Sequence, residues 1–340
     1  MTNDIQDGLN QVLHENGKSL IYRFTPALIC EGSPLLIIFS AWGTKIPSRF
    51  SNQKWNVLSL IDTHGIDGNS CGYLGERGDW FVHEMVEYII SKAIEKCKCV
   101  CRENLFMYSS SIASIGAIRY SITFEAKAIF LNAPIIQTNN ITMTKVSRKE
   151  NFDFPYDPKN RDVIESDMVQ FMKAYSDKYL PTFFVVDSLY QNEDWLENFL
   201  EEHTLRFVNA CKEEGATVYL ELKETTGHII HYNMKDIVLK FETYTPPKYL
   251  LDIFNTSIVL NNHELKVVVS LGRDYPFSND VEYAFYLLYQ GETKEKRPYQ
   301  KNSDIKFSLE DDWDISSIKV RIYIKHKNGH ILADNIAISV

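Results

Sequence analysis

Three residues that lie far apart in the sequence are of the types that form a serine nucleophile with its acid and base: Ser111, Asp187 and His228. A serine hydroxyl becomes a strong nucleophile when a histidine takes its proton and a carboxylate orients that histidine. The chain order serine, acid, histidine is typical of such groups on a mostly parallel sheet. The order and the local contexts described below predict acyl-transfer chemistry.

Ser111 lies in a run that predicts a short strand over 105–108, a tight turn of small residues, and a helix over 112–124. A nucleophile elbow usually reads G-x-S-x-G, whereas residues 109–113 read Ser-Ser-Ser-Ile-Ala. Small residues suit this strained turn, at a higher steric cost than glycine. Two alternatives remain open: Ser110 is the nucleophile if the register is shifted by one, or a serine only caps the helix.

The acid and base candidates each follow a predicted strand. Asp187 comes directly after the apolar residues 183–186, and His228 follows Gly227 on a loop after the strand 217–222. Asp194 is the alternative acid, although its place before the helix predicted over 195–214 also suits an N-cap. We expect these loops to meet at the carboxyl edge of the sheet.

His231, three residues after His228, is expected to begin the next helix and to pack or bind substrate. The pair lacks the glutamate and the four-residue spacing of H-E-x-x-H, so no metal site is predicted. The cysteines 97, 99 and 101 are spaced so that, on a strand, Cys97 and Cys101 would point the same way, but no C-x-x-C spacing or second ligand pair accompanies them. We interpret the six cysteines as reduced and structural.

An acyl-transfer site also needs two N–H groups for the oxyanion. One is expected from Ile112, the residue after the nucleophile, and the other from Ala41 or Trp42, on the loop after the strand 35–39. A second glycine-rich loop, 62–75, is expected on the same edge of the sheet. Asp62 and Tyr73 on this loop are therefore candidates for substrate contact.

The composition excludes several classes of function. With 36 basic and 45 acidic residues among 340, the net charge of −9 argues against nucleic-acid binding. No apolar run reaches bilayer length, and residues 1–7 are polar and acidic, unlike a signal peptide. A cytoplasmic protein is therefore expected.

The chain falls into two predicted domains. From residue 35 to about 242, strand and helix patterns alternate, which predicts a mostly parallel sheet with helices on both faces in a domain spanning 1–245. The polar segment 137–160 interrupts the rhythm, either as a lid or as a solvated loop. After the two prolines at 246–247, half-buried strand patterns predict an immunoglobulin-like β-sandwich over 246–340, interpreted as a binding or assembly module.

The first domain resembles α/β-hydrolase-fold proteins of bacterial capsular and surface polysaccharide biosynthesis and, more remotely, the acetyltransferase-like component of the accessory Sec system. The resemblance covers roughly residues 35–242, and a few segments carry it: 108–117 (YSSSIASIGA), 227–233 (GHIIHYN), 39–43 (FSAWG), 72–73 (GY), Asp62 and Asp187. The elbow departs from the family, which usually has glycine at positions 109, 113 and 114.

This resemblance implies an O-acetyltransferase that uses acetyl-CoA as donor and a carbohydrate hydroxyl as acceptor, without a bound cofactor. It also implies peripheral association with a glycan-synthesis complex, and a homo-oligomer is compatible with it. Two alternatives stay open. With water as acceptor the same residues make an esterase, and with a degenerate elbow the chain is a non-catalytic scaffold.

Overall fold

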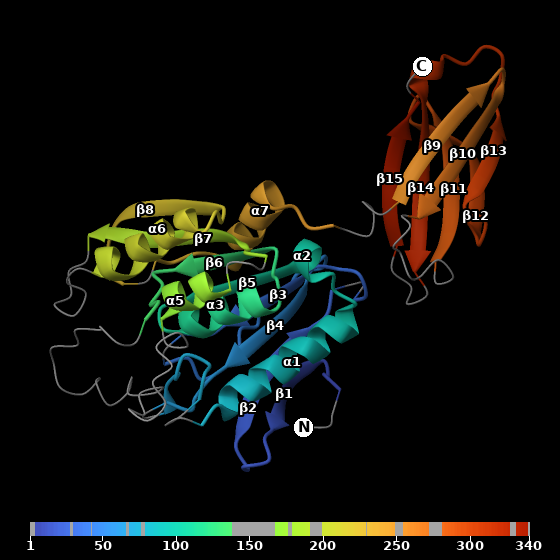
Figure 1. Cartoon of the computed structure of the whole chain (residues 1–340). Coiled ribbons are helices and arrows are strands. Elements are labelled where there is room, and N and C mark those ends of the chain that lie inside the picture. The colour runs from blue at the N-terminus through green and yellow to red at the C-terminus, as the bar shows by residue number, and fades with distance from the viewer. Residues whose placement is uncertain are drawn as a thin grey trace. The chain divides into compact units, whose positions relative to one another are not determined.

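The computed structural model describes residues 4–27, 30–41, 43–65, 68–75, 79–137, 167–175, 179–190, 199–228, 230–248, 254–271, 281–326 and 331–338. The chain divides into two compact units, Met1–Pro247 and Lys248–Val340 (Figure 1). The possible lid, 137–160, lies outside the described residues except for Gln137. Within the described ranges, no helix has the length and apolar character that crossing a bilayer requires.

The first unit is built on an eight-stranded sheet with the order β1-β2-β4-β3-β5-β6-β7-β8. Neighbouring strands from β4 to β8 pair in parallel, whereas β1 and β2 are antiparallel, so the sheet is mixed and mostly parallel, as predicted. The strands are β1 (Gly8–Leu13), β2 (Ser19–Thr25), β3 (Leu35–Phe39), β4 (Asn56–Ile61), β5 (Leu105–Ser110), β6 (Ala128–Asn132), β7 (Thr182–Tyr190) and β8 (Val218–Thr226).

Helices cover both faces of this sheet, as predicted, but unequally. Side chains of α1, α3, α5 and α6 share one large core with one face of the central strands. On the other face, Phe241 of α7 packs against Phe106 and Phe184. The helices are α1 (Phe81–Cys97), α2 (Cys101–Asn104), α3 (Ala113–Thr123), α5 (Met168–Ala174), the π-helix η4 (Leu200–Leu205), α6 (Arg206–Glu213) and α7 (Met234–Tyr244).

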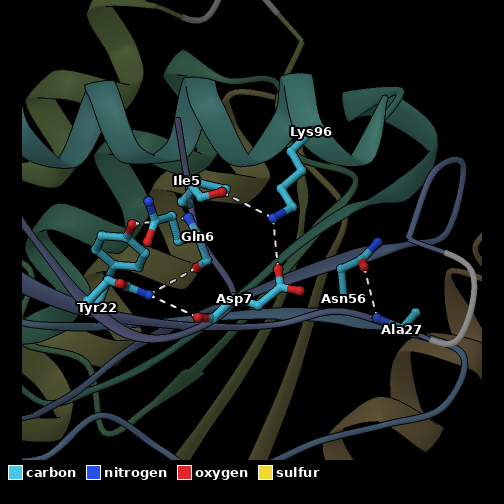
Figure 2. A network of polar contacts seen from close by, with 8 residues as sticks. Ile5, Gln6, Asp7, Tyr22, Ala27, Asn56 and Lys96 are labelled. Atoms are coloured by element: carbon cyan, nitrogen blue, oxygen red, sulfur yellow. Dashed lines mark hydrogen bonds and ion pairs between the residues drawn. The ribbon is translucent and has the colours of Figure 1, made fainter. Parts of the chain in front are cut away.

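The sequence pattern predicts that the sheet begins at residue 35. In the structure the hairpin β1–β2, which precedes that residue, adds two further strands to the sheet. The residues just before this hairpin are hydrogen-bonded to α1. Lys96 of α1 donates to the Ile5 carbonyl at 3.0 Å and to the Asp7 carboxylate at 2.7 Å (Figure 2). The hairpin was missed because β1, GLNQVL, is an edge strand with mostly exposed or half-buried side chains. Such a strand lacks the continuous apolar run of a central parallel strand.

The second unit is a sandwich of two antiparallel sheets around its own core, ordered β13-β10-β9 and β12-β11-β14-β15. The immunoglobulin-like topology stays a prediction. β12, ETKEKRPYQ, was missed because it is an exposed, charged edge strand, a composition that blocks edge-to-edge pairing. The elements are β9 (Phe254–Asn261), β10 (Glu264–Leu271), β11 (Val281–Tyr289), β12 (Glu292–Gln300), β13 (Asp304–Ser308), the 3₁₀-helix η7 (Ile315–Ser317), β14 (Ile318–His326) and β15 (Ile331–Ala337).

Candidate active site

Ser111 occupies the turn between β5 and α3, and its backbone has a left-handed φ of +52°. This conformation costs a non-glycine residue about 1–3 kcal/mol, so the surroundings must hold it. The Ser111 N–H donates to the Asn132 carbonyl at 3.0 Å, and the Ser111 carbonyl accepts from the N–H groups of Ser114 at 3.0 Å and Ile135 at 3.2 Å. The strained turn is therefore fixed by its neighbours in the fold.

The three serines of the turn have different environments. Ser109 and Ser114 share a hydrogen bond of 3.0 Å between their buried hydroxyls. Ile112 is the N-cap residue of α3 and makes no side-chain cap, so the alternative in which a serine caps this helix is not realised. The Oγ atom of Ser111, not that of Ser110, lies 2.8 Å from Nε2 of His228. This contact supports the predicted register.

His228 lies on the irregular loop between β8 and α7. Its ring packs edge-on against Phe199 with centroids 4.8 Å apart, and its side chain is half-buried. The helix after this loop begins at Met234, where the Asn233 side chain caps the Lys235 N–H at 3.0 Å. The expectation that His231 begins the helix is therefore wrong: His231 is an exposed loop residue.

Asp187 lies within β7, which runs past it to Tyr190, and its carboxylate is fully buried. One carboxylate oxygen accepts from the Ser188 N–H at 2.7 Å and the other from the Thr204 hydroxyl at 2.6 Å. Burial raises the pKa of Asp187 to about 6, although both hydrogen bonds favour the ionised form. The alternative acid, Asp194, lies outside the described residues.

The π-helix η4 contributes two buried side chains that sequence reasoning missed. Thr204 is the hydroxyl donor to Asp187, and His203 accepts from the Ile136 N–H at 3.3 Å. Burial, followed by the nearby charge of His228, lowers the pKa of His203 to about 3. His203 is thus a neutral core residue beside His228. A threonine 17 positions after the acid carries no sequence signal, because only the fold brings the two together.

Of the predicted oxyanion donors, Ile112 is the best defined. Ile112 follows Ser111 directly, and within the described part of the chain the Ile112 N–H has no hydrogen-bond acceptor. Ala41 is described and half-buried on the loop after β3, whereas Trp42 lies outside the described residues. The Tyr73 hydroxyl holds the start of that loop in place, because it donates to the Ser40 carbonyl oxygen at 3.0 Å.

The structure gives Asp62 and Tyr73 a different role from the predicted substrate contact. The Asp62 carboxylate is buried and accepts from the Ser70 hydroxyl at 2.9 Å and from the N–H groups of Cys71 at 2.7 Å and Tyr73 at 3.0 Å. Tyr73 has no exposed surface. Both side chains are engaged inside the fold, so we assign them to the shape of the 62–75 loop, which backs α3.

The close approach expected of an elbow glycine occurs one turn later, at Gly116 of α3. A Cβ atom there would lie 2.6 Å from the Gly72 carbonyl oxygen and 2.8 Å from Cβ of Tyr73. We therefore expect Gly116→Ala to destabilise the first unit by about 1–3 kcal/mol in urea unfolding. At a helical position with free space, replacing glycine by alanine stabilises the protein by about 1 kcal/mol. The sign of the change in stability therefore distinguishes a crowded position from an open one. Unchanged or increased stability would contradict the packing.

The described residues contain no group of three or more histidine, cysteine or acidic side chains able to hold a metal ion. All six cysteines are free thiols. Cys97 ends α1 and Cys101 begins α2, so these cysteines do not lie on one strand.

No family model matches the sequence, and no curated protein matches it. Among solved structures, the fluorophosphonate-binding serine hydrolase F of Staphylococcus aureus is similar, with 12% identity and a TM-score of 0.52 over 71% of this chain and 98% of that chain. The acylaminoacyl peptidase of Pyrococcus horikoshii matches with 14% identity and a TM-score of 0.52, over 73% of this chain and 42% of that chain. The capsule O-acetyltransferase of Neisseria meningitidis serogroup A has 16% sequence identity and a TM-score of 0.49, and the match covers 72% of this chain and 95% of that chain.

At such low identity these similarities concern the fold alone. The two structures with a TM-score of 0.52 match the unit that contains the mixed, mostly parallel sheet with helices on both faces. The first unit of this chain has an α/β-hydrolase-like fold.

Proposed function

We propose that this protein is a serine acyltransferase or esterase in which Ser111 carries the acyl group. The observation that supports this most directly is the 2.8 Å contact between Oγ of Ser111 and Nε2 of His228. This distance lets a neutral imidazole accept the hydroxyl proton as the oxygen attacks. The left-handed turn at Ser111 adds the strain expected of a nucleophile elbow.

In the proposed reaction, Oγ of Ser111 attacks the acyl carbonyl while His228 takes its proton. The tetrahedral oxyanion is stabilised by the Ile112 N–H and by a second amide from the loop after β3. When the intermediate collapses, the bond to the leaving group breaks, and His228 returns the proton to it. An acceptor hydroxyl then attacks the acyl-serine while His228 takes its proton. When the second tetrahedral intermediate collapses, the bond between the acyl carbon and Oγ breaks and His228 returns the proton to Ser111. We assign Asp187 to the acid that stabilises the imidazolium.

The acceptor and donor form the finer part of the proposal. The resemblance of the segments around Ser111 and His228 to capsular polysaccharide proteins supports a carbohydrate hydroxyl as acceptor and acetyl-CoA as donor. Water as acceptor gives an esterase through the same first half-reaction.

A paired assay on the purified full chain tests both parts. Release of CoA from acetyl-CoA is followed with and without capsule oligosaccharides, beside hydrolysis of a chromogenic acetyl ester. Acceptor-dependent CoA release that is lost in Ser111→Ala supports the transferase. Ester hydrolysis alone supports the esterase.

A fluorophosphonate probe tests the nucleophile separately. Attack by Oγ of Ser111 would form a serine–phosphorus bond and expel fluoride, and a peptide mass shift would locate the adduct. If the protein is silent in both turnover assays and no serine is labelled, serine acyl chemistry is contradicted and a scaffold is favoured.

A further inference from the structure

Asn132, the last residue of β6, contacts both the turn that carries Ser111 and the loop that carries His228. Its carbonyl oxygen accepts from the Ser111 N–H at 3.0 Å. Its side chain makes two hydrogen bonds to Ile230, from Nδ2 to the Ile230 carbonyl at 2.6 Å and from the Ile230 N–H to Oδ1 at 3.2 Å. Asn132 and Ile230 are 98 residues apart in the chain.

We propose that Asn132 is a positioning residue that sets the distance between Ser111 and His228. The inference rests on the proposed function and deepens it. Ile230 follows His228 by two residues, so fixing its backbone limits where the imidazole can lie. Asn132 thus contacts both the residue of the nucleophile and the loop of the base, and it is itself only 1% exposed.

The side chain at this position must offer both a donor and an acceptor. The asparagine amide presents an N–H₂ group and a carbonyl side by side, which matches the N–H and carbonyl of one backbone residue. Aspartate of the same volume keeps an acceptor for the Ile230 N–H, but when ionised it faces the Ile230 carbonyl without a donor. Alanine loses both hydrogen bonds and leaves buried backbone groups unsatisfied.

A second contact holds the other side of His228. The Ser188 hydroxyl donates to the Gly227 carbonyl at 2.7 Å, one residue before His228. The loop is thus fixed from β6 through Asn132 and from β7 through Ser188. Because this pair holds one loop, removal of both contacts should be non-additive.

The effect on catalysis follows from the geometry of proton transfer. A displacement of about 1 Å in a reacting group can lower the rate by about 100-fold. When the backbone of Ile230 is no longer held, the distance and angle between Nε2 of His228 and Oγ of Ser111 change, although both groups are still present. We therefore expect kcat to fall while KM changes little.

Asn56 provides a matched control. It is also a buried asparagine at a strand end: its Oδ1 accepts from the Ala27 N–H at 2.9 Å, and its Nδ2 donates to the Cys30 carbonyl at 2.8 Å (Figure 2 shows the contact with Ala27). These contacts join the start of β4 to the segment between β2 and β3 and include neither Ser111 nor His228. Asn56→Ala thus removes a comparable set of hydrogen bonds without touching the site.

The experiment compares kcat and KM of Asn132→Ala, Asn132→Asp and Asn56→Ala, each corrected for the folded fraction, with the turnover substrate of the wild-type protein. We expect kcat to fall about 10- to 100-fold in both Asn132 variants and to stay within about twofold in Asn56→Ala. Asn132→Asp keeps the side-chain volume, so it carries the test if the alanine variant does not fold. Combined with Ser188→Ala, Asn132→Ala should show a non-additive loss of kcat, and combined with Asn56→Ala an additive one.

Two outcomes overturn the inference: wild-type kcat in folded Asn132→Asp at a pH at which the introduced carboxyl is ionised, or equal losses in the Asn132 and Asn56 variants. Both are distinct from failure of the proposed function, in which the wild-type protein has no turnover and fluorophosphonate labels no serine.

Discussion

Ser111→Ala is expected to lower kcat by at least about 1,000-fold while leaving the free energy of unfolding nearly unchanged. The substitution removes the only atom that forms the acyl bond, Oγ, which lies 2.8 Å from Nε2 of His228. It keeps the backbone contacts of residue 111 with Asn132, Ser114 and Ile135, so the turn stays in place. Ester hydrolysis or CoA release checks the rate, and urea unfolding checks the fold.

Ser110→Ala is the matched control for this prediction. Ser110 is as buried as Ser111, at 6% exposure, and ends β5 one position earlier. We expect this variant to keep kcat within a few-fold of wild type and to be labelled by fluorophosphonate at residue 111. The assignment fails if Ser111→Ala keeps a substantial rate, and the register fails if Ser110→Ala loses it instead.

The central part of the fold could be predicted from the sequence because each element there has a strong local signal. β3 is a continuous apolar run, as a strand buried on both faces requires, and its bounds coincide with the strand predicted over 35–39. The strand, turn and helix around Ser111 were predicted from small residues between apolar runs, even without glycine. In contrast, β1 and β12 are polar edge strands, and their pairing depends on neighbours that the local pattern does not reveal.

The site could be predicted only where residue type and chain order carry information. Ser111 and His228 meet at hydrogen-bond distance, as the order predicted. Tyr73 and Asp62 were mistaken for substrate contacts because the sequence showed the right edge of the sheet but not the inward direction of the side chains. Thr204 and Asn132 were missed because their roles arise from contacts that span 17 and 98 positions.

Asp187→Asn is expected to lower kcat on the order of 1,000-fold if Asp187 is the acid that stabilises the imidazolium of His228. Asparagine keeps the size of the side chain but not the negative charge. Asp194→Asn is the comparison, because Asp194 is the alternative acid in the sequence. If Asp194→Asn loses activity and Asp187→Asn keeps it, the acid is reassigned and the buried carboxyl of Asp187 is structural.

The pH dependence of stability tests the environment of Asp187 independently of catalysis. Because burial raises its pKa from 3.8 to about 6, the folded protein holds this proton over a pH range in which the unfolded chain has released it. The neutral form stabilises the fold, so this contribution is complete below about pH 4 and is lost as the pH rises through about 6. The loss amounts to about 3 kcal/mol.

Urea unfolding of the wild type and of Asp187→Asn between pH 4 and 7.5 measures this contribution as the difference between the two curves. The wild type should lose stability relative to the variant across this range, since asparagine does not titrate. The ionised carboxylate that the proposed reaction uses is thus the form that the fold holds less well, and activity and stability should change in opposite directions near pH 6. Parallel curves would show that Asp187 has an ordinary pKa and is not held in a desolvated site.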